Sequence, residues 1–144
     1  MISLLPGVQS TTAALGAERI RLDVIAQNIA NANTTRGLDG KPYQRQQVVF
    51  ESALSQAQSG MGADARLGGP KVSRIIKDER PLRQVYEPGH PDADRATGMV
   101  QLPNVNMHEE MADLIAASRT FEANLAVLRT AKQMTLQTMN IGKR

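Results

Sequence analysis

The chain has 144 residues, a formal net charge of +3 and no cysteine, which excludes disulfides, thiolate metal sites and thiol nucleophiles. This length suits one ordinary domain. Only 3% of the residues are aromatic and none is tryptophan, so the core must be built from Leu, Ile, Val, Met and Ala, which favours long helices over a compact globule.

The positive charge is spread thinly along the chain. Residues 1–35 carry 2 basic and 2 acidic side chains, residues 36–105 carry 10 and 8, and residues 106–144 carry 5 and 4. Because no basic tail and few stacking aromatics are present, nucleic-acid binding is not expected. The N-terminal MISLLPGVQS lacks a charged region and is interrupted by Pro6 and Gly7, so we expect no cleaved secretory signal. The sequence has no apolar run of about 18 residues, so no membrane span is predicted.

The first predicted element is a helix within residues 1–35. Its apolar residues recur at a strict spacing of seven, which is a heptad seam formed by Val8, Leu15, Leu22 and Ile29. It runs into the stretch NIANANTTRG, residues 28–37, whose short polar side chains prefer caps and turns to helix interiors. These side chains either bind backbone groups at the helix end or a neighbouring subunit, or they simply stop the helix. Gly37 permits the turn that follows.

Residues 36–105 are predicted to form a small β-rich lobe. Strands are expected at 43–50, 72–76, 82–86 and 98–102, each bounded by Gly, Pro or Asp. The Ser-, Ala-, Gln- and Gly-rich stretch at 52–70 predicts a flexible loop.

The last element is a strongly predicted helix at 106–144. Asn106 is the expected N-cap, with Glu109 three residues later as in a capping box. Its seam alternates steps of four and three, and includes Leu114, Phe121, Leu125 and Leu128. The two helices would span roughly 45 and 50 Å. We therefore expect an α+β fold in which the terminal helices pack as a coiled-coil-like stalk and the β-rich lobe is inserted between them.

Some apolar side chains fall off the main stripes of both helices, namely Ile20, Ile115 and Leu136. A two-helix hairpin cannot cover both of its faces. Leftover apolar surface on long helices predicts contacts with other chains, so these three are candidate intersubunit residues.

A chemical role is harder to support. His90 lies near Asp92 and Asp94, so a metal site is conceivable, but the flanking prolines and the lack of a second nearby histidine favour a turn. No nucleophile elbow or phosphate loop is present. We therefore predict no catalytic, cofactor or metal site, and an enzyme is not expected.

The stretch IAQNIANANT, residues 25–34, resembles the N-terminal signature of bacterial flagellar rod and hook proteins. Three further stretches, at 40–50, 85–94 and 102–134, are similar to proteins of the proximal rod. The residues that carry the rod-family motif are Asn28, Ile29, Ala30, Asn31, Asn33 and Thr34.

This resemblance implies a structural, non-enzymatic subunit of the proximal rod of the flagellar basal body, the driveshaft that transmits torque from motor to hook. Residues 1–35 and 106–144 would form the inner tube by polymerising, with 36–105 as the outer lobe. The implied partners are copies of the chain and other rod proteins, and the type III export apparatus in transit, with no small-molecule substrate. The implied location is the periplasmic rod, reached without a cleaved signal. A cytoplasmic coiled-coil adaptor or chaperone is the alternative.

Overall fold

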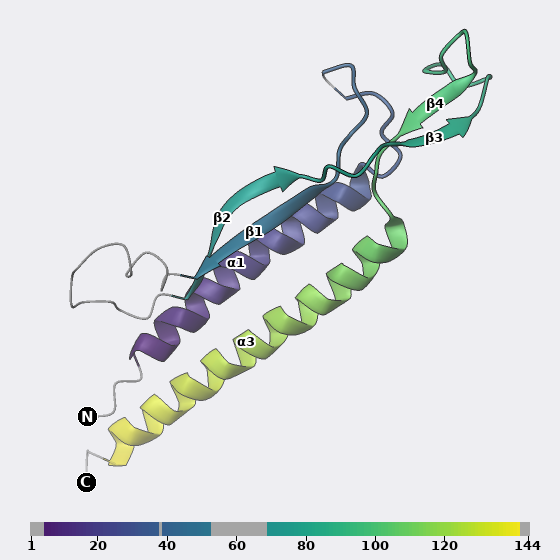
Figure 1. The fold of residues 1–144 in the computed structure, drawn as a ribbon. Helices are drawn as coiled ribbons and strands as arrows, with labels where there is room; N and C mark the ends of the chain where they lie inside the picture. Colours follow the sequence, from purple (N-terminus) through teal and green to yellow (C-terminus); the bar gives the residue numbers. More distant parts are fainter. Residues whose placement is uncertain (1–4, 38, 53–68, 142–144) are drawn as a thin grey trace, which may run out of the picture.

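The structure is a computed structural model that describes residues 5–37, 39–52 and 69–141. Two long helices flank a small β-strand region, which confirms the predicted α+β fold (Figure 1). The elements in chain order are α1 (Leu5–Ala30), β1 (Gln46–Ser52), β2 (Pro70–Lys77), β3 (Arg83–Tyr86), β4 (Met99–Leu102) and α3 (Met107–Ile141).

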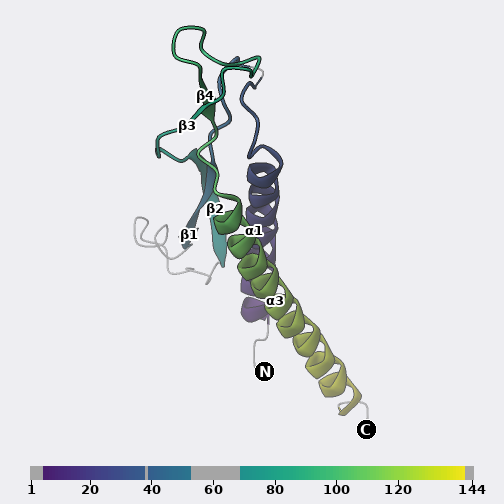
Figure 2. The same cartoon turned by 90° about the vertical axis from the view of Figure 1, so that its right-hand side faces the viewer.

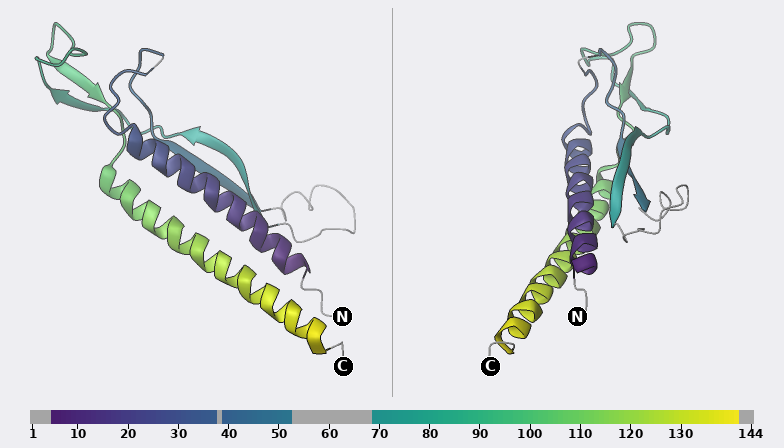
Figure 3. Two further views of the ribbon diagram at one scale, coloured as in Figure 1. Left: turned by 180° about the vertical axis from the view of Figure 1, so that it is seen from behind. Right: turned by 90° about the vertical axis from the view of Figure 1, so that its left-hand side faces the viewer.

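The two helices pack against each other in opposite directions, so the first turns of α1 lie at the same end as the last turns of α3 (Figure 1). With 26 and 35 residues, they span about 39 and 52 Å. Side views show that they cross at an angle and that the C-terminal part of α3 extends away from α1 (Figures 2 and 3). Much of the second half of α3 therefore lacks cover from α1.

Short polar side chains mark the helix ends. The side-chain oxygen of Asn106 accepts a hydrogen bond from the backbone N–H of His108 at 3.1 Å, which confirms Asn106 as the N-cap of α3. α1 ends at Ala30, where the backbone and side-chain nitrogens of Asn31 both donate to the carbonyl of Gln27, at 3.0 and 2.9 Å. The predicted motif thus begins inside the helix and ends in the turn that follows it.

The strands form two separate antiparallel pairs. β1 pairs with β2 from Gln46 opposite Lys77 to Ser52 opposite Pro70, with a bulge between Val49 and Phe50. β3 pairs with β4, with Arg83 opposite Leu102. All four strands overlap their predicted ranges. Residues 53–68 of the predicted flexible loop lie outside the described residues. The prediction was wrong at its edges, because Ser52 is the last residue of β1 and Pro70 is the first residue of β2.

The two strand pairs take different positions. The β1–β2 pair lies along α1 and contacts it, while the β3–β4 pair lies beyond the end of the helices (Figures 1 and 3). The apolar core is small; its buried members are Ala17, Val24 and Ile25 on α1, Val100 on β4, Val105 just before α3 and Ala117 on α3. In the part of the chain that the structure describes, neither helix has an apolar stretch long enough to cross a membrane.

Candidate functional site

A buried polar junction connects the end of α1, the chain entering β1, the end of β2 and the start of α3. We define this polar junction by its hydrogen-bonded members, which are Asn28, Tyr43, Arg45, Gln46, Asp78, Asn104 and Glu110. Four of them, Asn28, Arg45, Asn104 and Glu110, are buried. Buried polar groups are tolerated only when they are hydrogen-bonded, so the connections between them determine whether the junction stabilises the fold.

Asn28 uses its full hydrogen-bonding capacity at 1% exposure. Its Oδ1 accepts from the backbone N–H of Gln46 and from the hydroxyl of Tyr43, both at 2.9 Å. Its Nδ2 donates to the carbonyl of Gln46 at 2.9 Å and to Oε2 of Glu110 at 3.0 Å. An asparagine amide has two donor hydrogens and two acceptor lone pairs. This side chain therefore pairs with both backbone groups of Gln46 as a neighbouring strand would, and also connects α1 to α3.

Glu110 is fully buried in the first turn of α3 and accepts hydrogen bonds on both oxygens. Oε2 accepts from Asn28, and Oε1 accepts from Nε of Arg45. Arg45 also reaches Asp78 at 3.3 Å and Asp113 at 3.4 Å. Both hydrogen-bond partners of Glu110 are donors. Only a carboxylate therefore satisfies position 110, because a glutamine amide there would turn its NH₂ group toward a donor.

Asn104 connects the junction to the end of β2. Its Oδ1 accepts from the backbone N–H of Arg45 at 2.8 Å, and its Nδ2 donates to the carbonyls of Asp78 and Arg80 at 3.2 and 2.9 Å. The backbone N–H of Arg80 donates to Asp78 and, with the Arg80 guanidinium, holds the pKa of that carboxyl below its ordinary value. A hydrogen bond from the Arg80 side chain likewise lowers the pKa of Glu109. The start of α3 is therefore bound electrostatically to the end of β2.

The remaining rod-family motif residues lie at the end of α1 and directly after it. Thr34 donates to the Asn31 side chain at 3.2 Å. Ile29 is half-buried, and Ala30 and Asn33 are exposed. Asn31 binds backbone at the helix end, whereas Asn28 binds distant segments of the same chain, a role that neither interpretation of the sequence included. Whether Asn33 contacts a neighbouring subunit stays a prediction.

The predicted seam lies beside the most buried face of α1 and not on it. All eight seam residues are half-buried, namely Val8, Leu15, Leu22, Ile29, Leu114, Phe121, Leu125 and Leu128. The fully buried positions of α1 are Ala17, Val24, Ile25 and Asn28. The offset has a physical cause, because α1 contacts the β1–β2 pair as well as α3, so its deepest face lies between these two neighbours. At the open end, Val8 and Leu128 line the same apolar groove.

The candidate intersubunit residues lie on the surface. Ile20, Ile115 and Leu136 are 39%, 56% and 52% exposed. Five further large apolar side chains of α3 are also exposed: Met111, Val127, Met134, Met139 and Ile141. An accumulation of this kind on one helix is typical of a surface that contacts other chains.

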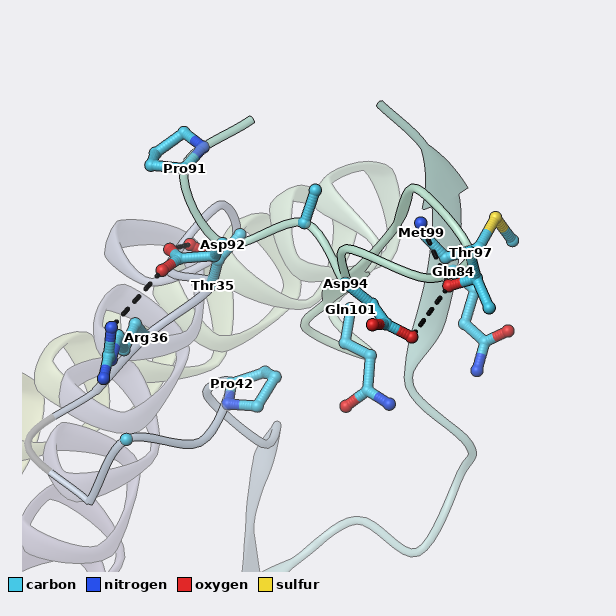
Figure 4. A pocket seen from close by; sticks show the side chains of 12 residues that line it. Thr35, Arg36, Pro42, Gln84, Pro91, Asp92, Asp94, Thr97, Met99 and Gln101 are labelled. Carbon is cyan, nitrogen blue, oxygen red and sulfur yellow. Dashed lines mark hydrogen bonds and ion pairs between the residues drawn. The ribbon is translucent and has the colours of Figure 1, made fainter. Parts of the chain in front are cut away.

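His90, Asp92 and Asp94 lie in the turns between β3 and β4; Figure 4 shows Asp92 and Asp94. Nδ1 of His90 accepts from the backbone N–H of Asp92 at 3.1 Å. Asp92 in turn binds the hydroxyl of Thr35 at 2.8 Å and lies 3.7 Å from the Arg36 guanidinium. Asp94 accepts from the N–H of Ala96, which lowers the pKa of this carboxyl, and from Thr97. Within residues 5–37, 39–52 and 69–141, no group of three or more acidic or histidine side chains could hold a metal ion.

Sequence reasoning missed most of the polar junction. From the sequence, no role is assigned to Glu110, Tyr43, Arg45 or Asn104. One signal was present, since Asn28 follows Val24 and Ile25 at helical spacing on an apolar face. A polar residue at such a position requires a buried partner.

Comparisons with known proteins match both terminal regions of the chain. The family model described as "Flagella basal body rod protein" matches residues 9–36, and that described as "Flagellar basal body rod FlgEFG protein C-terminal" matches residues 96–141. Three relatives are each named flagellar basal-body rod protein FlgC. The Salmonella typhimurium protein is 43% identical over 91% of this chain and 92% of its own. The Yersinia enterocolitica protein is 42% identical over 99% of this chain and 100% of its own. The Bacillus subtilis protein is 39% identical over 92% of this chain and 94% of its own. The chain belongs to the FlgC family of flagellar basal-body rod proteins.

Proposed function

We propose that this chain is a structural subunit of the proximal rod of the flagellar basal body and polymerises through α1 and α3 into a torque-transmitting shaft. The observation that carries this proposal is the apolar surface of α3. Residues 132–141 of that helix are all exposed, and they include Met134, Leu136, Met139 and Ile141. In a family of rod proteins, such a helix end is best explained by burial against other subunits.

The second half of α3 needs neighbours for a physical reason. An isolated helix of about 10–15 residues is marginal in water, and most helix stability in proteins comes from packing of an apolar face. α1 does not bury residues 132–141 of α3, because the C-terminal part of α3 diverges from it (Figures 2 and 3). Other subunits would cover the exposed side chains and stabilise the helix as they bind.

The partners would be copies of this chain and other rod proteins. Different surfaces of one subunit meeting successive neighbours form heterologous contacts, which generate an open helical array. Ile20 on α1 and Ile115 and Leu136 on α3 would contribute to such contacts. In this arrangement residues 1–35 and 106–144 form the inner tube and residues 36–105 the outer lobe, although the β1–β2 pair of that lobe lies along α1.

We further propose that the chain reaches the periplasmic part of the rod through the flagellar type III export apparatus, without a cleaved signal. Passage through a narrow channel requires an unfolded chain, and with no cysteine there is no disulfide to break first. Mass spectrometry of the subunit from isolated rods tests this point, because a cleaved signal would shorten it.

The polymerisation proposal is tested by site-specific photocrosslinking in a strain whose own gene for this protein is deleted. A photoreactive residue replaces Ile115 or Leu136, and buried Val24 serves as the matched control. We expect crosslinks to other rod subunits from positions 115 and 136, and only same-chain products from position 24. Same-chain products from all three positions, or a chain that stays in the cytoplasm, would favour the adaptor alternative.

A further inference from the structure

We propose that the hydrogen bond between Asn28 and Glu110 sets the register of α1 against α3, a task that the apolar seam cannot perform alone. The two side chains lie 82 positions apart in the chain and meet in the buried centre of the polar junction, at 3.0 Å. A single buried polar residue is known to fix register in coiled coils, at some cost in stability.

The apolar seam is ambiguous because it repeats. Its α1 members follow one another at intervals of seven, and so do Leu114, Phe121 and Leu128 on α3. Sliding α3 by seven residues, about 10.5 Å, therefore sets apolar side chains against apolar side chains again. The seam defines which faces meet, but it discriminates poorly between registers that differ by one repeat.

The polar pair does not repeat. The positions seven residues from Glu110 are Pro103 and Ala117, and neither side chain can accept a hydrogen bond. A shift that sets Ala117 against Asn28 would leave one donor of the Asn28 amide without its acceptor. It would also move the Glu110 carboxylate away from its donors. An unpaired buried charge is strongly destabilising, so the shifted registers are excluded.

The segment before β1 holds both partners in place. Gln46 fixes the Asn28 amide through its backbone N–H and carbonyl, and the adjacent Arg45 binds the other oxygen of Glu110. Because Asn28 and Arg45 both lie outside α3, any sliding of α3 has to break the bonds to both oxygens of Glu110. If the proposed rod function holds, a shifted subunit would displace its lattice contacts by about 10.5 Å.

The test uses disulfide formation in the purified full-length chain, which has no cysteine of its own. Val8→Cys is combined in turn with Phe121→Cys, Leu128→Cys or Thr135→Cys, which differ by one repeat. Since Val8 and Leu128 line one groove, oxidation of the otherwise unaltered chain should give mainly the 8–128 product. The yields of the three cysteine pairs are then measured again in chains that also carry Glu110→Leu.

In the Glu110→Leu background we expect the ratio of the 8–128 product to the 8–121 and 8–135 products to fall by about tenfold or more. Asp113→Leu is the matched control, because it removes a carboxylate that also contacts Arg45, at 3.4 Å, and lies outside the Asn28 bond. The control should retain the native product. Circular dichroism confirms that the helices are formed in each variant.

Two results would overturn the proposal. One is an exclusive 8–128 product in the Glu110→Leu chain, and the other is equal yields of the three products in the chain that retains Glu110. If Glu110→Leu loses its helical signal, Asn28→Leu answers the same question, since it removes the other partner of the bond, and an unchanged product ratio would contradict the proposal. None of these measurements requires a rod, so failure of the proposed function would leave them unaffected.

Discussion

Gly69 lies so close to α1 that a Cβ built on it would fall 2.4 Å from the carbonyl oxygen of Ser10. The same Cβ would come within 3.0 Å of the Cβ of Ala13. Both neighbours belong to α1, and the first is backbone, so neither can move aside easily. The absence of a side chain at position 69 is therefore what allows the chain entering β2 to approach the helix.

Gly69→Ala should lower the free energy of unfolding by about 1–3 kcal/mol, the usual cost of overpacking. Urea denaturation followed by circular dichroism measures this change. Gly16→Ala is the matched control, since nothing lies within 4 Å of the new methyl group and position 16 is within α1. The control should stabilise the chain by about 0.5–1 kcal/mol. Equal effects of the two substitutions would contradict the close approach.

Asn28→Asp tests the polar junction with almost no change in shape. The new carboxylate oxygen would face the carbonyl of Gln46 and the Glu110 carboxylate, both of which now accept from Nδ2. Placing a charge against two acceptors in a buried site should cost about 3–5 kcal/mol. Exposed Asn33 of the same motif provides the control, and Asn33→Asp should change the free energy of unfolding by less than about 0.5 kcal/mol. Chemical denaturation at neutral pH compares the two, and similar losses would refute the role of Asn28.

Acid should weaken the attachment of α3 to β2. The folded-state pKa of Asp78 is held below the ordinary 3.8 by the backbone N–H and guanidinium of Arg80 and by Arg45. The unfolded chain therefore binds a proton first as the pH falls, so stability is fully present above pH 3.8 and declines as the pH drops through the depressed folded pKa. Asp78→Asn should reduce this decline.

The comparison is made by urea titrations at several values between pH 5 and pH 2, the acid range over which a paired carboxylate loses its contribution. Exposed Asp23 on α1 supplies the control variant, Asp23→Asn, which should retain the acid sensitivity of the unaltered chain. An unchanged slope in Asp78→Asn would show that this carboxylate does not contribute.

Sequence reasoning succeeded for features that depend on nearby residues. The Asn106 cap, the two helices and the four strands all follow from the spacing of apolar residues and from the capping and turn residues a few positions away. The polar junction depends instead on pairs such as Asn28–Glu110 and Arg45–Asn104, which are 82 and 59 positions apart. No local pattern encodes which distant donor meets which acceptor. The seam was displaced for the same reason, because the β1–β2 pair covers a second face of α1.

Ile115→Ser separates assembly from folding. Its side chain is 56% exposed, so the free energy of unfolding of the isolated chain should change by less than about 0.5 kcal/mol. Incorporation into rods and swimming motility should both fall, because the substitution would remove the proposed apolar contact with a neighbouring subunit. Thr120→Ser, at an exposed position of the same helix, is the control and should assemble normally. Normal incorporation of Ile115→Ser would remove this residue from the interface.

Tyr43 should titrate above its ordinary pKa of 10.0, because burial disfavours the phenolate and the nearby Glu110 carboxylate repels it. The chain has only two tyrosines and no tryptophan, so ultraviolet absorbance of the Tyr86→Phe variant reports Tyr43 alone. The unfolded chain loses this proton first as the pH rises, so stability should decline above pH 10. Glu110→Gln should move the absorbance midpoint toward 10.0 by removing the repulsion. A midpoint at 10.0 in the folded Tyr86→Phe chain would mean that Tyr43 is not buried beside Glu110 in solution.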